Sequence, residues 1–326
     1  MGAVPVVVVG DTLAELVVPV TEAGSPTEDP RALVVRPHGA AARTAVWLAS
    51  LGIPTTLVGR IGEDALGRAI AADLARRRVD VVLRAVPGAP TGTVVTLTSP
   101  YGEAARVDEP GAAAMLSPDD LPADTFVAGT HLHLAGRALV DPSGSGVGAA
   151  AIRLARTAGM TVSAEPPPVP VLQALDPATA RTALSGVDLL VTGVAEAFAL
   201  VEDVLEQEGG DLRPERYAAA LARSVAAVVV TGGPAGAWWH GRRSAPAHVM
   251  VHGDADRGTG DVSLDPFTDD GTRDDVRPAF VAGLLAAWLL DARPVQALRS
   301  GCTIATRARG GPDPLPDEGG GARVRT

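Results

Sequence analysis

The stretch VPVVVVGD, residues 4–11, decides the class of fold. Its unbroken run of β-branched residues ends at Gly10, a pattern typical of a strand that is buried on both faces of a parallel sheet. A parallel sheet needs crossover connections, which are usually helices. We therefore expect strands and helices to alternate along the chain.

The segments that follow have this alternation. Residues 39–52, GAAARTAVWLASLG, have helical spacing and end in glycine, and residues 55–62 again resemble a strand. Later strand-like runs, among them HLHLAG and VAAVVVTGG, are separated by helical segments. Repeated units of this kind predict a mostly parallel sheet that is covered on both faces.

Two regions depart from the alternation. Residues 80–111 contain short strand-like runs broken at PGAPTG and SPYGE, without helical periodicity, and predict a small accessory sheet. Residues 317–326 are rich in Gly and Arg and predict a flexible tail. We expect one α/β domain over residues 1–316, with the strands of the accessory sheet drawn from about 12–20 and 80–110.

Composition excludes several classes of function. The net charge is −10 and all 28 cationic residues are arginine, so no lysine is present for a P-loop or a Schiff base. An acidic chain with 3% aromatic residues is poorly suited to nucleic acid. No apolar run reaches the ~18 residues of a membrane span. A single cysteine, Cys302, fits a reducing compartment, and we expect a cytoplasmic protein.

Motifs spread over the whole chain resemble the ribokinase-like (PfkB) family of sugar and nucleoside kinases. They occur in one order from about residue 4 to residue 312: VVVVGDTLAELVVP, GAAARTAVWLASLG, VGRIGEDALGRAI, PTGTVVTLTSPYGEAAR, LHLAGRAL, VTGGPAGAWW, GTGD and AFVAGLLAAWLL. The resemblance implies a three-layer α/β/α sandwich with a small β-sheet lid. It also implies ATP-dependent phosphoryl transfer to a hydroxyl of a small sugar or sugar acid, with Mg²⁺ on the phosphates.

The resemblance assigns roles to individual residues. Asp261 of GTGD takes the position of the catalytic base. The substrate positions are Glu15, Gly39 and Arg43, and Glu196 takes the position that organises Mg²⁺ through water. The remaining positions are the anion hole, formed by the amides of Gly258, Thr259 and Gly260, and the ATP-side loop with Thr231, Gly233 and Gly236.

Several positions depart from the family pattern. Arg43 stands where the family commonly has Asn, and a fixed charge there favours a substrate that carries a carboxylate or phosphate. Gly193 replaces the Asn of the magnesium motif, and Glu165 is the nearest acid where the family has an Asp-Pro pair. His131 and His133 alternate along one strand, and without a third ligand we interpret both as structural.

The largest departure lies between GTGD and the helix AFVAGLL, which follows such a turn directly in the family. Residues 262–278 are either an insertion beside a working turn or a sign that the turn is displaced, with the helix beginning at Pro278. In the second geometry the chain would be a catalytically impaired member that binds a sugar or metabolite. A third possible function is that of a nucleoside kinase.

The family resemblance also suggests a homodimer that forms through the lid strands.

Overall fold

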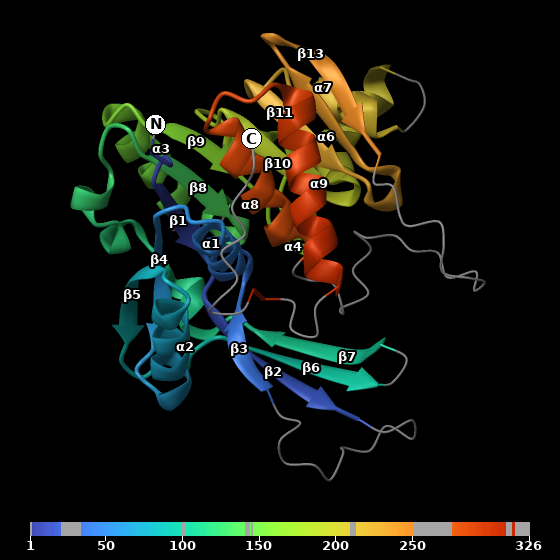
Figure 1. The fold of residues 1–326 in the computed structure, drawn as a ribbon. Coiled ribbons are helices and arrows are strands. Elements are labelled where there is room, and N and C mark those ends of the chain that lie inside the picture. Colours follow the sequence, from blue (N-terminus) through green and yellow to red (C-terminus); the bar gives the residue numbers. More distant parts are fainter. Residues whose placement is uncertain are drawn as a thin grey trace.

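The structure is a computed structural model of the chain. It describes residues 2–20, 34–99, 102–140, 144, 146–208, 213–250, 276–310 and 315–316. Figure 1 shows a large sheet with helices on both sides and, apart from it, a small sheet. The predicted tail, residues 317–326, lies outside the described residues.

Within the described residues, the large sheet has nine strands in the order β13-β12-β11-β10-β9-β8-β1-β4-β5. All neighbours are parallel except β11 with β12 and β12 with β13, which form the antiparallel edge. Their bounds are β1 Val6–Gly10, β4 Thr55–Gly62, β5 Asp80–Val86, β8 His131–Ala135, β9 Thr161–Ala164, β10 Leu189–Gly193, β11 Ala227–Thr231, β12 Ala237–Gly241 and β13 Ser244–Val249.

The valines of β1 explain how the sheet is held. Val6 and Val8 belong to one apolar core, while Val7 and Val9 belong to the other, and all four are buried. Because successive side chains of a strand point to opposite faces, an unbroken apolar run fills two cores at once. The sequence-based prediction of a strand buried on both faces is confirmed.

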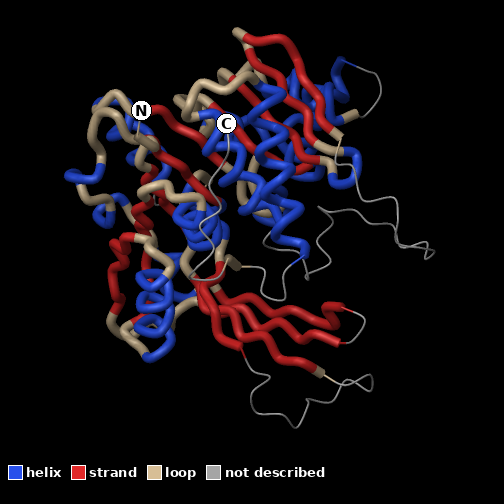
Figure 2. The backbone as a smooth tube through the Cα atoms, in the orientation of Figure 1, coloured by secondary structure: helices blue, strands red, loops and turns tan. Residues whose placement is uncertain are grey.

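Helices cover both faces, as the tube in Figure 2 also shows. The first core receives α1 Ala40–Ser50, α2 Ala65–Arg76, α8 Val276–Trp288 and α9 Pro294–Gly310. The second core receives α3 Val147–Thr157, α4 Val169–Gln173, α5 Pro177–Thr182, α6 Val194–Glu208 and α7 Pro214–Leu221. Short 3-10 turns span Gly111–Met115, Pro118–Asp120, Ala123–Thr125, Gly136–Ala138 and Gly233–Ala235. No helix among the described residues is long and apolar enough to cross a bilayer.

The small sheet, in the part of the chain that the structure describes, has four strands in the order β3-β2-β6-β7. Their bounds are β2 Leu13–Pro19, β3 Val34–His38, β6 Thr93–Ser99 and β7 Gly102–Glu109. The chain enters this sheet from the carboxyl ends of β1 and β5 and leaves it from β3 into α1. The small sheet therefore stands at the carboxyl edge of the large sheet, the edge at which open α/β sheets bind ligands.

The accessory-sheet prediction was right in part. Residues within 12–20 and 93–109 do form the small sheet, but β5, Asp80–Val86, pairs with β4 in the large sheet. Here β4, α2 and β5 form one strand-helix-strand unit, in which the second strand returns parallel to the first. The strand β3 was missed, because Pro37 and the exposed Val34 and Val35 hide its pattern.

A row of polar side chains, all buried except Thr161 at its end, runs along β8 and β9. His131 Nδ1 lies 2.7 Å from the Thr161 hydroxyl, and His131 Nε2 lies 2.7 Å from Ser163 Oγ. Ser163 Oγ lies 2.8 Å from His133 Nδ1, and His133 Nε2 lies 3.1 Å from Glu165 Oε1. Each group can donate to the next and accept from the one before, so the row satisfies both buried imidazoles. The contacts agree with the structural interpretation of the two histidines.

Protonation of His131 should destabilise the fold. Burial, together with the nearby charges of His133 and Arg156, lowers the pKa of His131 well below its ordinary value. The unfolded chain therefore binds a proton more readily, so the stability that depends on the neutral ring is complete above about pH 6.5 and is lost as the pH falls.

We expect the wild-type free energy of unfolding to decrease below this pH with a contribution of up to about 1.4 kcal/mol per pH unit from this residue. In His131→Gln the slope should be shallower, measured by urea unfolding between pH 8 and pH 5. His240→Gln, at the partly exposed end of β12, controls for the loss of one histidine. A slope unchanged by His131→Gln would contradict the assignment.

Candidate functional site

One face of the small sheet gathers polar and charged side chains from all four strands. Glu15 on β2 is paired with Arg36 on β3, and His38 lies two residues further along on the same face. Thr96 on β6 is paired with Arg106 on β7. Because side chains two residues apart share a face, the strand register alone brings these groups together.

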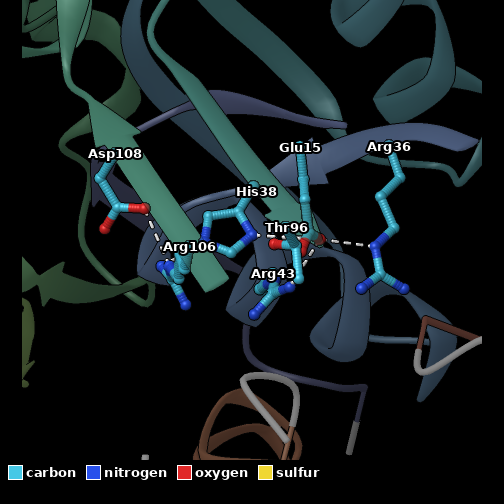
Figure 3. A network of polar contacts seen from close by, with 7 residues as sticks. All are labelled: Glu15, Arg36, His38, Arg43, Thr96, Arg106 and Asp108. Carbon is cyan, nitrogen blue, oxygen red and sulfur yellow. Dashed lines mark hydrogen bonds and ion pairs between the residues drawn. The ribbon is translucent and has the colours of Figure 1, made fainter. Parts of the chain in front are cut away.

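Glu15 is the centre of this group, which Figure 3 shows from close by. Arg36 Nε donates to Glu15 Oε2 at 2.6 Å, and Arg43 Nη2 donates to the same oxygen at 3.0 Å. The Thr96 hydroxyl donates to Glu15 Oε1 at 2.8 Å. Two strands of the small sheet and the helix α1 are thus bound to one carboxylate on β2. We call Glu15, Arg36, His38, Arg43, Thr96 and Arg106 the Glu15 cluster.

His38 extends the Glu15 cluster toward β7. Its Nδ1 lies 3.3 Å from Glu15 Oε2, and its Nε2 lies 3.0 Å from Arg106 Nη2. A guanidinium can only donate, so Nε2 is the acceptor and Nδ1 carries the proton that faces Glu15. Arg106 Nε also donates to Asp108 Oδ1 at 2.8 Å.

The surroundings of Glu15 stabilise its charged form. The residue is 1% exposed, and burial alone would raise its pKa. The hydrogen bond from His38 and the charge of Arg43 outweigh burial, with a further hydrogen bond from Arg36, and hold the pKa of Glu15 well below its ordinary value. Arg43 is as buried as Glu15, whereas the side chains of Arg36 and Arg106 are 15% and 24% exposed.

Gly39 brings α1 against the carboxyl end of β1. It is the N-cap of α1 with φ 96°, a conformation that favours glycine, and a Cβ there would collide with the backbone oxygen of Asp11. This close approach places Arg43, one turn into α1, over Glu15. The structure thus brings together the three sequence-predicted substrate residues Glu15, Gly39 and Arg43, and gives Gly39 a packing role.

The predicted ATP-side loop follows β11 as a tight turn. The Thr231 hydroxyl donates to the carbonyl of Thr192 at 3.1 Å, at the carboxyl ends of β11 and β10. Gly233 and Gly236 have φ values of 66° and 92°, and the backbone of Val249 leaves no room for a Cβ at Gly236. The loop therefore depends on its glycines, and most of its backbone amides donate to carbonyl oxygens within the turn.

Glu196 lies in the first turn of α6, directly after β10. Its Oε1 accepts a hydrogen bond at 2.6 Å from Arg277 Nη1 of α8. Burial would raise the pKa of Glu196, but the charge and hydrogen bond of Arg277, with the backbone amides of Glu196 and Gly193, lower it below its ordinary value. Part of this arrangement is a helix cap, in which a carboxylate in the first turn accepts from the preceding backbone.

The described residues do not fit a magnesium ion at Glu196. Magnesium is held by carboxylates, water and substrate phosphates. Here Arg277 engages the Glu196 carboxylate, and Gly193 offers no side chain where the family resemblance implies an asparagine. Within the described part of the chain, no three His, Cys, Asp or Glu side chains gather as a metal cluster.

The predicted catalytic turn lies outside the described residues. This applies to Asp261 and to Gly258, Thr259 and Gly260 of the anion hole, whose roles remain predictions. The helix that follows them, α8, spans Val276–Trp288 and has Pro278 as its third residue.

The sequence reasoning missed several residues of the site. Arg36 and His38 were missed with their strand, whereas Arg106 could have been found from the alternation of Thr96, Arg106 and Asp108 once β6 and β7 were paired. Arg277 gave no local signal, because it stands 81 positions from its partner Glu196. Only the fold brings the two together.

Removal of the Glu15 carboxylate should strongly destabilise the protein. Glu15→Gln leaves the guanidinium groups of Arg36 and Arg43 without their shared counter-charge, and breaking a buried ion pair from one side costs about 3–5 kcal/mol. We expect a loss of this size in urea unfolding at pH 7. The control is Glu63→Gln, at an exposed position, with a change within about 0.5 kcal/mol. Equal stabilities of the two variants would show that the Glu15 cluster does not hold the small sheet.

Comparisons with known proteins agree with this architecture. An ATP-dependent ribose-1-phosphate kinase from Halopiger xanaduensis is 28% identical over 281 residues, which cover 85% of this chain and 82% of that one. A solved PfkB protein from Polaromonas sp. JS666 has a TM-score of 0.74 at 23% identity and covers 97% of this chain and 98% of its own. A Ribokinase II from E. coli, solved in complex with ATP and Mg²⁺, has a TM-score of 0.73 at 21% identity and covers 98% and 96%.

The family model described as pfkB family carbohydrate kinase matches residues 5–249. This range includes both sheets up to the end of β13, the Glu15 cluster and the loop after β11. The predicted ribokinase-like α/β fold, with its large mostly parallel sheet and its small second sheet, is confirmed. The chain belongs to the pfkB family of carbohydrate kinases.

Proposed function

We propose that this chain is an ATP-dependent kinase that phosphorylates a hydroxyl of a small sugar carrying a carboxylate or a phosphate. The observation that carries the proposal is the Glu15 cluster, in which two arginines and a histidine lie against one glutamate and a third arginine contacts the histidine, at the carboxyl edge of the large sheet. Guanidinium groups suit carboxylate and phosphate.

The arginines divide into two roles. Arg43 is buried and holds Glu15, so it is a positioning residue. Arg36 and Arg106 are partly exposed on the same face and are the groups that would meet the anionic part of the substrate. The relative that is named a ribose-1-phosphate kinase supports a phosphorylated sugar among these substrates.

The chemical step assigns one task to each part of the site. The Asp261 carboxylate accepts the proton of the substrate hydroxyl, whose oxygen attacks the γ-phosphorus of ATP. The bond from that phosphorus to the bridging oxygen breaks, and ADP leaves. The amides of Gly258, Thr259 and Gly260 stabilise the charge on the transferred group, and the loop with Thr231, Gly233 and Gly236 holds the nucleotide.

A catalytically impaired member is the second candidate. It is favoured by Pro278, the third residue of α8, which has no N–H to offer a phosphate. Such a protein would keep the Glu15 cluster and bind the same class of sugar without turning it over.

The exposed face of the small sheet supports a homodimer. Val35 and Val107 are 42% and 67% exposed, and the register places them on the face opposite the Glu15 cluster. A second copy of the same face would cover both. Sedimentation velocity should give the mass of a dimer that Val107→Glu dissociates, and a wild-type monomer at micromolar concentration would contradict this arrangement.

Substitution of Asp261 separates the two candidate functions. A kinase should release ADP from ATP when given a sugar phosphate or a sugar acid, and Asp261→Asn should lower kcat by at least about a hundredfold, the scale of a lost general base. Asp254→Asn, in the same stretch of the chain, is the control. Wild-type protein that binds these sugars but releases no ADP would be the impaired member. Equal activity of Asp261→Asn and wild type would remove Asp261 from the mechanism.

A further inference from the structure

Arg277 reaches across the carboxyl end of β10. Its Nη1 donates to Glu196 Oε1 at 2.6 Å, and its side chain is 30% exposed. A Cβ on Gly193 would lie 2.6 Å from Arg277 Nη2 and would also collide with the carboxylate of Glu196. A side chain at position 193 would displace the guanidinium and the carboxylate from this arrangement, so Gly193, Glu196 and Arg277 fit one another as a set.

This set lies beside the loop to which we assign the nucleotide. Gly193 and Thr231 are paired at the ends of β10 and β11, and the Thr231 hydroxyl donates to the neighbouring carbonyl of Thr192. The carboxyl ends of parallel strands are where such sheets bind ligands. Arg277 thus brings a permanent positive charge to the part of the edge where phosphates would lie.

The ion pair holds the guanidinium in a fixed orientation. Glu196 is 7% exposed and is itself fixed by the amides at the start of α6. A guanidinium carries five N–H donors in a rigid plane, so it can bind a carboxylate on one edge and a phosphate on another. A negatively charged Glu196 without Arg277 would repel nucleotide phosphates, and with Arg277 it orients their binding partner.

The absence of asparagine at position 193 does not by itself explain the arrangement of Gly193, Glu196 and Arg277. The chain contains no asparagine at all, so Gly193 needs no functional cause when considered alone. The contact of Arg277 with Glu196 in the space beside Gly193 is a separate observation. It places a cation where the family resemblance implies a side chain that serves magnesium.

We propose that Arg277 is a phosphate-binding residue of the nucleotide site, positioned by Glu196 in the space that Gly193 leaves open, and that nucleotide phosphates bind this chain without Mg²⁺. This inference rests on the proposed function for the presence of a nucleotide. It assigns to Glu196 the positioning of an arginine rather than of a metal ion.

The test is the affinity for ADP, measured by calorimetry in excess Mg²⁺ and in EDTA. For the wild type we expect the two Kd values to agree within about threefold, less than 1 kcal/mol. Arg277→Gln should weaken binding in EDTA by at least about tenfold, the factor that corresponds to one charge-assisted hydrogen bond. In this variant Mg²⁺ should restore part of the affinity, because Glu196 has lost its partner. Gly193→Ala should also weaken binding in EDTA.

Two further variants keep the test decisive. Arg153→Gln, at an exposed position of α3 on the other face of the sheet, should bind as the wild type does. Arg277→Lys keeps the charge and should retain binding in EDTA within about fivefold, less than the loss expected when the charge is removed. If Arg277→Gln does not fold, this variant and Gly193→Ala decide the question.

The outcomes separate the inference from the function on which it rests. Wild-type binding that is lost in EDTA would overturn the inference and leave the kinase proposal standing. The inference would also be overturned if folded Arg277→Gln bound ADP in EDTA as tightly as the wild type does. It would equally be overturned if folded Arg277→Lys lost ADP binding in EDTA. No binding of ADP with or without Mg²⁺ would overturn both.

Discussion

The structure around the substrate side depends on one buried carboxylate. Glu15 connects β2 to β3 through Arg36, to β6 through Thr96 and to α1 through Arg43, with 1% of its surface exposed. A buried ion is costly unless it is paired and hydrogen-bonded, so these partners must stay together for any of them to remain buried. The orientation of the small sheet against α1 follows from this constraint.

The ion pair of Arg277 with Glu196 repeats the same design beside the loop to which we assign the nucleotide. Arg43 comes one turn into α1 and Arg277 is the second residue of α8, and these two helices pack in the same core. Each arginine reaches a glutamate, and each glutamate is nearly buried. In a chain with a net charge of −10 and no lysine, arginines held by fixed carboxylates supply local positive charge where anions would bind.

Most of the fold could be predicted from the sequence because its signals are local. The valines of β1 specify a two-sided strand, and the small residues of α1 specify a helix that is buried all round. The strands β3 and β5 could not be assigned correctly, because a proline interrupts the first and the second has the exposed edge pattern of an accessory strand. Only the pairing of β5 with β4 places it in the large sheet.

The site residues that belong to sequence motifs could be predicted, whereas those that are defined only by contacts in the folded protein could not. Glu15, Gly39, Arg43 and Glu196 stand at motif positions, and the structure brings the first three together. Arg36, Arg106 and Arg277 are arginines among 28, and their importance follows only from the strand register and the packing of α8. The same packing pairs Glu196, which the family resemblance assigns to Mg²⁺, with an arginine.

The central claim is that the Glu15 cluster selects an anionic sugar, and paired binding measurements test it most directly. Wild-type protein with ADP present would be titrated calorimetrically with ribose, with its monophosphates and with the corresponding sugar acid. We predict that at least one anionic ligand binds about tenfold or more tightly than ribose, as expected for one charge-assisted contact with a guanidinium. Ribose that binds as tightly as every anionic ligand would contradict the account.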